Sequence, residues 1–220
     1  RFGLLEILHQ SQGLSGYLSM ISIVIFGCCE IAKSNLKNKS VKLLNYANEI
    51  GITNFDTAPL YSKGYSEILI GEVFKNKNSI FVTTKVGKYS TPNLFIPSNI
   101  AIPLNSIIKN RNKKIRNFFY IDNNKNICEN HFKTEILKSR KRLKNNIDSV
   151  LIHELNPYKI DTKVLNNINC FLSKVGINKF GYGGALHNEF FEKKIPHMFD
   201  IVQIPFPVYF DDNYDKIKQL

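Results

Sequence analysis

Short apolar segments alternate with longer segments of helical periodicity along most of this 220-residue chain. The segments with the length and composition of strands lie at 21–26, 53–56, 80–85, 147–153, 177–182 and 201–204. Strands that alternate with helices are typical of βα units, whose strands join a parallel sheet. Six such units in succession predict an α/β fold of the (β/α)8 TIM-barrel class, with about six of the eight units present.

The segments between the strands carry helix signals, because their apolar residues recur on one face. The first helix should begin near Ser40 and end before Gly51, a residue suited to a C-terminal cap. Ser66 is expected to cap the next helix, with Glu67 in its first turn. The last clear helix should stop at Gly176. The residues that these three helices should bury are Val41, Leu44, Ala47 and Ile50, then Ile68, Leu69 and Val73, then Val164, Leu165, Ile168, Phe171, Leu172 and Val175.

A long irregular segment at about 88–130 interrupts this rhythm after the third strand. It is rich in Asn, Lys and Ile, contains several prolines and has a hairpin signal at 122–126. In a barrel such a segment would lie over the mouth, where it either shapes a substrate pocket or forms a surface insertion. With 43% hydrophobic residues, the chain is expected to form one incomplete TIM-barrel domain at 1–220.

Polar residues stand at or near the ends of three successive expected strands. Asp56 ends the second strand, Lys85 the third and His153 the fourth, while Tyr61 follows the second strand in a turn-rich loop. Taken singly, each residue fits an ordinary structural role: a turn cap, a packed ring, a solvated charge or a core histidine. Because the C-terminal ends of barrel strands form one face, the four side chains should meet there. The scattered histidines and cysteines predict no metal site.

Together, these four residues indicate a site that donates a proton to a substrate oxygen. A phenol has an unperturbed pKa of about 10, and a nearby ammonium favours the phenolate. Lys85 should therefore lower the pKa of Tyr61 and make it a usable general acid. Asp56 would hold Lys85 charged and in place, and His153 would orient a substrate carbonyl. Such a site protonates an oxygen while something else adds to the carbon. No residue here looks like the source of a hydride, so a bound cofactor must supply it.

Four segments in the same order resemble the aldo-keto reductase family. The segment 54–71 resembles the family signature, and 81–87 resembles its lysine-bearing strand. The segment 139–154 resembles the helix and strand that deliver its histidine. The segment 199–206 resembles the strand that brings a glutamine to the nicotinamide, and the likeness covers most of 21–210.

This resemblance implies a catalytic tetrad and a cofactor site. The tetrad would comprise Asp56, Tyr61, Lys85 and His153, and it would reduce an aldehyde or ketone with NADPH, with NADH as a possible substitute. The implied cofactor contacts are Gly27, Asp56, Gly183 and Gln203. Tyr61 would protonate the oxygen while hydride passes from the nicotinamide to the carbonyl carbon.

The sequence departs from the family pattern in two places. Where relatives end the fifth strand with small polar residues that hold the nicotinamide amide, this chain has Gly183 and Gly184, and Pro207 replaces a polar residue after Gln203. The sequence also stops at Leu220, before a seventh and an eighth unit, which indicates a truncated member. Two alternatives to a working enzyme remain: a binding or regulatory protein with weak turnover, and a remnant.

The formal net charge of +12 raises the question of a polyanionic partner. The densest basic run, at 138–144, lies on an expected helix whose apolar residues Phe132, Ile136 and Leu143 face elsewhere, which favours a solvated outer helix over a nucleic-acid site. The apolar stretch 14–29 resembles a secretion signal, but glycine and serine interrupt it and a barrel strand fits better. Four cysteines without CxxC spacing favour reduced thiols and a cytoplasmic protein. The expected partner is a small carbonyl compound, with neither nucleic acid nor membrane.

Overall fold

The structure is a computed structural model, and it describes residues 24–32, 37–75, 79–87, 129–185, 189, 193 and 195–204. Its strands are β1 (Ile25–Gly27), β2 (Asn54–Asp56), β3 (Phe81–Val86), β4 (Ser149–His153), β5 (Lys179–Gly183) and β6 (Ile201–Gln203). Its α-helices are α1 (Lys37–Glu49), α2 (Tyr65–Val73), α5 (Glu129–Arg142) and α6 (Thr162–Lys174). Two short 3-10 helices are η1 (Tyr61–Gly64) and η2 (Pro157–Lys159).

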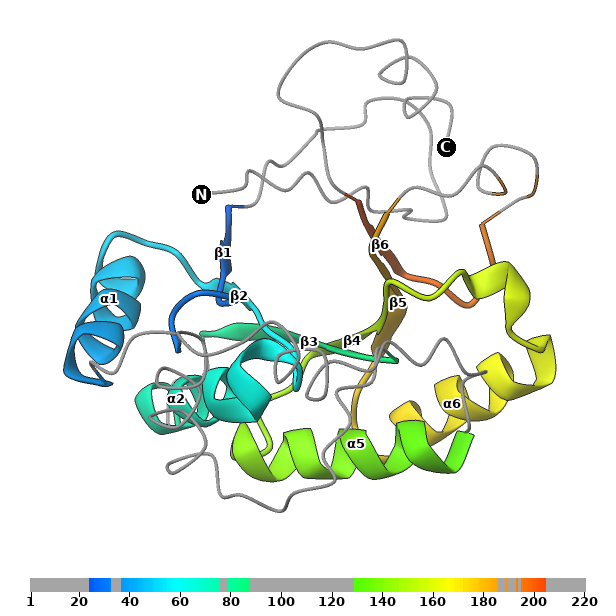
Figure 1. Cartoon of the computed structure of the whole chain (residues 1–220), viewed down its shortest axis with the longest axis horizontal. Coiled ribbons are helices and arrows are strands. Elements are labelled where there is room, and N and C mark those ends of the chain that lie inside the picture. The colour runs from blue at the N-terminus through cyan, green and yellow to red at the C-terminus, as the bar shows by residue number, and fades with distance from the viewer. Residues whose placement is uncertain are drawn as a thin grey trace, which may run out of the picture.

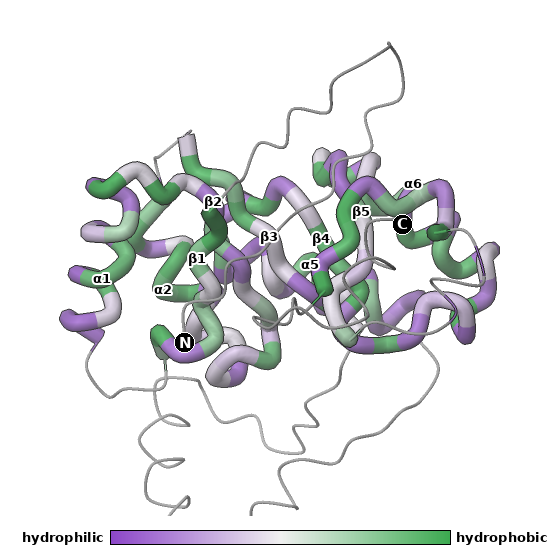
Figure 2. Tube along the Cα trace, turned by 90° about the horizontal axis from the view of Figure 1, so that it is seen from above, coloured by the Kyte–Doolittle hydropathy of each residue, from purple (hydrophilic) through white to green (hydrophobic). Residues whose placement is uncertain are grey.

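The strands form one parallel sheet in chain order, from β1 to β6. Figure 1 shows the sheet curling into a trough, with the helices along its outer side. Figure 2 shows green and purple positions alternating along the helices, as expected when one helix face meets a core. This arrangement confirms the expected fold: six parallel strands of a (β/α)8 barrel, with α1, α2, α5 and α6 in the segments between the strands from β1 to β5.

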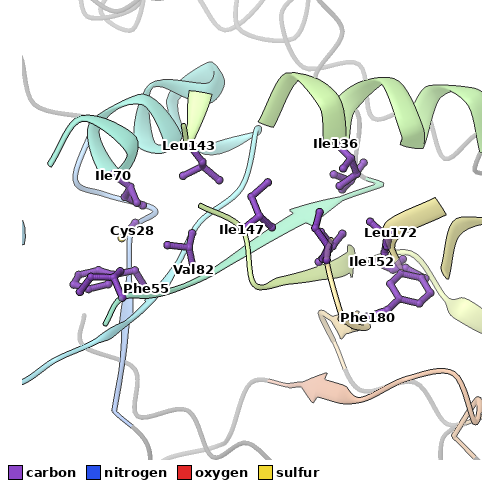
Figure 3. Close-up of a cluster of buried hydrophobic side chains, with 14 of the residues drawn as sticks. Cys28, Phe55, Ile70, Val82, Ile136, Leu143, Ile147, Ile152, Leu172 and Phe180 are labelled. Atoms are coloured by element: carbon purple, nitrogen blue, oxygen red, sulfur yellow. The ribbon is translucent and has the colours of Figure 1, made fainter. Parts of the chain in front are cut away.

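The hydrophobic core lies between the curled sheet and the outer helices. In Figure 3, Ile70 and Ile136 reach from the helix layer toward Val82 and Ile152 on the strands. All four side chains are fully buried. The core stiffens the strands, so it holds their C-terminal ends in fixed positions.

Helix α1 begins earlier than predicted and ends before Gly51, as expected. It begins at Lys37, before the expected start, and Ser40 lies inside it and is buried. Gly51 caps the C-terminus as expected, with φ of +93°, a backbone conformation that glycine adopts easily. The prediction that Ile50 is buried is wrong: it lies beyond the last helical residue, and 58% of its surface is exposed. Of the other expected core residues, Leu44 and Ala47 are buried and Val41 is partly buried.

Helix α2 is not capped by Ser66, because the helix begins one residue earlier, at Tyr65. Gly64 occupies the cap position in the left-handed conformation and provides no side-chain hydrogen bond. Ser66 lies in the first turn and directs its hydroxyl to the carbonyl of Cys28, 2.9 Å away. Of the residues expected to face inward, Leu69 is buried and Ile68 and Val73 are partly buried.

Helix α6 matches its prediction closely. Asp161 caps its N-terminus by accepting a hydrogen bond from the backbone N–H of Lys163, at 2.8 Å. The helix stops at Lys174, and Gly176 follows with φ of +77°. Its core-facing residues are Leu165, Ile168 and Leu172, which are buried, and Val164, Phe171 and Val175, which are partly buried.

Several strands begin later than the sequence indicates. At β4 the expected start at 147 is two residues early, because the Asp148 carboxylate, rather than a ladder carbonyl, accepts the Val82 N–H at 2.7 Å. The Asp200 carboxylate likewise accepts the Phe180 N–H, at 2.9 Å, just before β6, which begins at Ile201 as expected. Strand β1 was expected at 21–26; among the described residues it starts at Ile25, and 21–23 lie outside them.

The irregular segment expected at 88–130 ends earlier than predicted, because α5 already begins at Glu129. Residues 88–128, including the expected hairpin at 122–126, lie outside the described part of the chain. Within the described residues, none of the helices has the length and apolar character needed to cross a membrane.

Candidate active site

The four predicted site residues come together at the C-terminal ends of the strands. Asp56 is the last residue of β2, His153 is the last of β4, and Lys85 is the last but one of β3. Tyr61 opens η1 in the loop that follows β2. Asp56, Lys85 and His153 are buried, and Tyr61 is partly exposed. The tyrosine is therefore the member of the group that faces outward most.

Sheet register explains how residues distant in sequence meet at one rim. Gly27 pairs with Asp56 across β1 and β2, and His153 pairs with Gly183 across β4 and β5. Gly183 in turn pairs with Gln203 of β6. Because neighbouring strands end at matching heights, all four predicted cofactor contacts lie on the same rim as the proton-donating residues.

Lys85 is the centre of the charged group. Its ammonium forms a buried ion pair with Oδ2 of Asp56. It also donates a hydrogen bond to the phenolic oxygen of Tyr61, at 3.3 Å. The same nitrogen lies 5.3 Å from the centre of the Tyr61 ring. One cation thus contacts both the carboxylate that balances its charge and the phenol.

His153 completes the group on the other side of the tyrosine. The imidazole and phenol rings have centroids 5.9 Å apart and are nearly perpendicular, at 88°. The Tyr61 ring therefore contacts both Lys85 and His153.

The pKa of Lys85 is raised, although burial alone would lower it. The attraction of Asp56, followed by that of Tyr61, and hydrogen bonds to both residues outweigh the loss of solvation. Lys85 therefore stays cationic at neutral pH. Its charge is available to stabilise negative charge that develops on the phenolic oxygen.

The expected lowering of the Tyr61 pKa is wrong in its net direction. Burial is the largest influence and raises the pKa, whereas Lys85 lowers it as predicted and Asp56 raises it again. The net effect is a pKa above that of an ordinary tyrosine. Tyr61 is consequently protonated at neutral pH, which is the state that a proton donor requires.

One oxygen of Asp56 has an unmet hydrogen-bonding capacity. Oδ2 pairs with Lys85, but Oδ1 is buried and finds no hydrogen-bond donor among the described residues. Buried carboxylate oxygens are rarely left in this state, because desolvation without a partner is unfavourable. A hydroxyl group from a bound molecule would satisfy this oxygen.

Gly183 lies against the inner side of the group. A Cβ atom there would be 3.2 Å from Cε of Lys85 and 3.3 Å from Oε1 of Gln203. Gly183 therefore brings its backbone close to both side chains and leaves the intervening space narrow. Gly27, at the other end of the rim, is different, because no atom of the described residues lies within 4 Å of such a Cβ. None of the described residues would obstruct a flat ligand that approached the backbone at Gly27.

The structure explains why residue 184 is glycine rather than a small polar residue. A Cβ at Gly184 would be 2.6 Å from the hydroxyl of Tyr182 and 2.7 Å from Cα of Glu154. That hydroxyl donates to the carbonyl of Ala185, at 2.6 Å. The tyrosine has therefore taken the space that a polar side chain at 184 would need.

Sequence reasoning missed a second group of buried polar residues behind the site. Glu67 is fully buried, accepts a hydrogen bond from Thr84 at 2.7 Å and pairs with Arg142, at 2.5 Å. Arg142 belongs to the basic run that was expected to be solvated, and for this residue the expectation is wrong. A carboxylate among apolar residues in a first helical turn was a usable signal, because a buried charge needs a partner. Nothing in the spacing identified a partner 75 residues away.

Among the residues that the structure covers, no group of three or more His, Cys, Asp or Glu side chains is placed to hold a metal ion. The described cysteines, Cys28, Cys29 and Cys170, carry thiols rather than disulfides.

Solved structures share this architecture. An aldo-keto reductase from Bacillus halodurans in its holo form superposes with a TM-score of 0.60 at 19% identity, over 83% of this chain and 52% of that protein. The glycerol dehydrogenase from Gluconobacter oxydans gives 0.58 at 19% identity, over 84% and 50%. An aldo-keto reductase from Klebsiella pneumoniae in complex with NADPH gives 0.50 at 16% identity, over 76% and 47%. These likenesses show the common barrel fold, and the chain spans about half the length of each of these structures.

Sequence comparisons agree with the structural ones. Over 68 residues, the chain is 38% identical to an uncharacterized oxidoreductase of Bacillus subtilis, a match that covers 30% of this chain and 22% of that protein. The sequence profile of the aldo/keto reductase family matches residues 24–175, which is more than half of the chain. The chain therefore belongs to the aldo/keto reductase family.

Proposed function

We propose that the protein reduces an aldehyde or ketone to an alcohol with NADPH, and that Tyr61 donates the proton. The observation that carries this proposal is the contact of Lys85 with both Asp56 and Tyr61, beside His153. A buried cation against a protonated phenol is suited to protonating an oxygen as negative charge develops on it. Family membership supports the same reaction class.

Each side chain has a separate task in this proposal. Tyr61 gives its proton to the carbonyl oxygen, and Lys85 stabilises the phenolate that remains. Asp56 keeps Lys85 charged and oriented through their ion pair. His153 lies edge-on to the phenol and hydrogen-bonds the carbonyl oxygen, so that the substrate carbon faces the cofactor. Solvent then returns a proton to Tyr61.

The residues present fit a nicotinamide cofactor. Asp56 Oδ1 needs a donor, which a ribose hydroxyl would provide, and Gln203 carries an amide beside Gly183 at the same rim. The backbone at Gly183 and the open approach at Gly27 would admit the flat ring and its ribose. Bound NADPH supplies the hydride that becomes the new C–H bond. NADPH is proposed over NADH because a family relative is solved with it.

The first test is substitution of the proton donor. Tyr61→Phe should abolish NADPH-dependent reduction of simple aldehydes, since it removes the transferable proton and leaves the ring. Binding of NADPH, measured by fluorescence titration, should be unchanged. Tyr46→Phe is the matched control, because Tyr46 lies on α1 with 59% of its surface exposed. Unchanged turnover in Tyr61→Phe would refute the assignment.

A second candidate is a cofactor-binding protein with little turnover. The crowding of Gly184 by the Tyr182 hydroxyl favours it, because no polar side chain at 184 can then hold the nicotinamide amide. Stoichiometric binding of NADPH without repeated turnover of any aldehyde would identify this second function. Repeated turnover would exclude it.

We also propose a cytoplasmic location and a small-molecule carbonyl substrate. The thiols of the described cysteines suit a reducing compartment. The site offers single hydrogen-bonding groups to one oxygen, which is the recognition that a small carbonyl compound needs. Retention of the thiols in protein isolated from cells would agree with this location, and disulfide formation would contradict it.

A further inference from the structure

The loop that carries Tyr61 is closed at its base by two hydroxyl groups. Thr57, which follows Asp56, lies 2.9 Å from the hydroxyl of Ser66. Ser66 donates its own proton to the carbonyl of Cys28, so Thr57 is the donor in the bond between the two hydroxyls. Both ends of the loop are thereby attached to each other and to the residue after β1.

Between these ends, the backbone adopts an unfavourable conformation. Ser62 and Lys63 follow Tyr61 directly and have φ values of 50° and 56°. Two consecutive residues other than glycine in the left-handed region carry an energetic penalty and persist only where neighbouring structure holds them. The position of Tyr61 therefore depends on contacts that keep this strained turn in place.

Glu67 connects this loop to the strand that carries Lys85. It lies in the first turn of α2, and its Oε1 accepts the hydroxyl of Thr84, at 2.7 Å. Thr84 and Lys85 are neighbours on β3, so their side chains point to opposite sides of the sheet. Thr84 meets the outer helix while Lys85 meets Tyr61. Fixing Thr84 to Glu67 therefore fixes the height of Lys85 relative to the loop.

Arg142 secures Glu67 from the end of α5. Its Nε lies 2.5 Å from Oε2 of Glu67, and its terminal nitrogen donates to Ser139, at 3.1 Å. The arginine stem also covers Gly64, the last residue of η1: a Cβ atom there would lie 2.9 Å from both Cδ and Nε. The side chain is only 22% exposed. Arg142 thus contacts both the end of the strained turn and the start of α2.

We propose that Glu67 and Arg142 form a positioning pair that holds Tyr61 against Lys85. The pair does not touch the reacting atoms; it sets the distance between the loop after β2 and strand β3. Its effect on turnover rests on the proposed function. Its effect on the position of Tyr61 does not, which allows the two proposals to fail separately.

The test compares Arg142→Met and Glu67→Gln with matched exposed variants on the same helices. Arg142→Met keeps the stem and removes the charge, and Glu67→Gln keeps the shape. The controls are Lys138→Met on α5 and Glu72→Gln on α2, each from a surface ion pair. Arg142→Lys is the conservative rescue, because its ammonium can still pair with Glu67.

Two readouts separate positioning from a general loss of stability. The first is the titration of Tyr61, followed by the NMR signal of labelled tyrosine and assigned with Tyr61→Phe. The groups that face the phenol are Lys85, Asp56, Cys29 and His153, and none of them is changed. The second readout is kcat for an aldehyde, measured alongside KM and the Kd of NADPH.

In Arg142→Met and Glu67→Gln, the pKa of Tyr61 should fall toward the free-tyrosine value of about 10, because burial is the largest influence that raises it. The kcat should drop by about 10- to 100-fold, the loss expected from misplacing a reacting group by an ångström or less, with an unchanged Kd for NADPH. Arg142→Lys should recover part of both changes. The two control variants should match the unaltered protein.

An unchanged Tyr61 titration in both folded variants would overturn the proposal. If the titration shifts but the unaltered protein turns over no aldehyde, the positioning pair stands and the proposed function fails. If Arg142→Met shows no cooperative unfolding, Glu67→Gln and Thr84→Val decide, since each weakens one contact of the network. Wild-type titration of Tyr61 in both of those folded variants would also overturn the proposal.

Discussion

Breaking the ion pair between Lys85 and Asp56 should lower the free energy of unfolding substantially. Both residues are buried, and the ammonium is the partner of Oδ2. Oδ1 has no donor among the described residues. Lys85→Met would therefore leave a buried carboxylate with neither a charge partner nor a hydrogen bond from the residues described.

The size of the effect follows from this isolation. Removing one member of a buried ion pair costs about 3–5 kcal/mol, because the remaining charge stays desolvated. Replacing both members by neutral groups of similar shape is far less harmful, since no charge remains. The free energy of unfolding of the double variant, Asp56→Asn with Lys85→Met, should therefore lie within about 2 kcal/mol of that of the unaltered protein. The remaining difference comes from one unsatisfied amide.

Urea unfolding followed by circular dichroism measures Lys85→Met, Asp56→Asn and the double variant that combines them. Lys85→Met should lose about 3–5 kcal/mol at pH 7. The double variant should be more stable than Lys85→Met alone. The reasoning would be refuted if the losses in free energy of unfolding of the two single variants summed to the loss of the double variant within about 0.5 kcal/mol. Such additivity would show that the two groups do not interact.

Two further predictions test the barrel itself. Gly181→Ala should lower the free energy of unfolding in urea by several kcal/mol, on the order of the larger single-site effects, because its Cβ would lie 1.9 Å from the Ile201 carbonyl oxygen. Gly27→Ala should change it little, because no described atom lies within 4 Å of the added Cβ. Equal effects would show that β5 and β6 are not packed as described. Leu172→Ala should cost about 2–5 kcal/mol because Leu172 is fully buried, whereas Leu137→Ala, at 49% exposure, should cost about 0.5 kcal/mol or less.

The strand order and the meeting of the four site residues were predictable from local patterns. Each strand lies in or next to a short segment that the sequence marks by its apolar residues, and Asp56, Lys85 and His153 stand at or next to strand ends, where a barrel brings side chains together. The roles of these residues remain predictions. So does the extent of the domain, because much of 1–220 lies outside the described residues.

The predictions that were wrong depend on contacts between distant segments. Ser66 has the composition of a helix cap, but Cys28 and Thr57 take its hydroxyl, and the helix starts earlier. Arg142 was read as part of a solvated basic run because its partner, Glu67, is 75 residues away. The pKa of Tyr61 was predicted from one neighbouring charge, whereas burial proved to be the larger influence. Neither burial nor long-range pairing is visible in a local pattern.

The most direct test of the central claim follows hydride and proton transfer in a single turnover. The protein is mixed with NADPH that carries deuterium at the transferred position of the nicotinamide, and with one equivalent of an aldehyde. The account predicts deuterium on the carbinol carbon of the product, and loss of this product in Tyr61→Phe. A deuterium-free alcohol, or the same labelled product at the same rate from Tyr61→Phe, would contradict it.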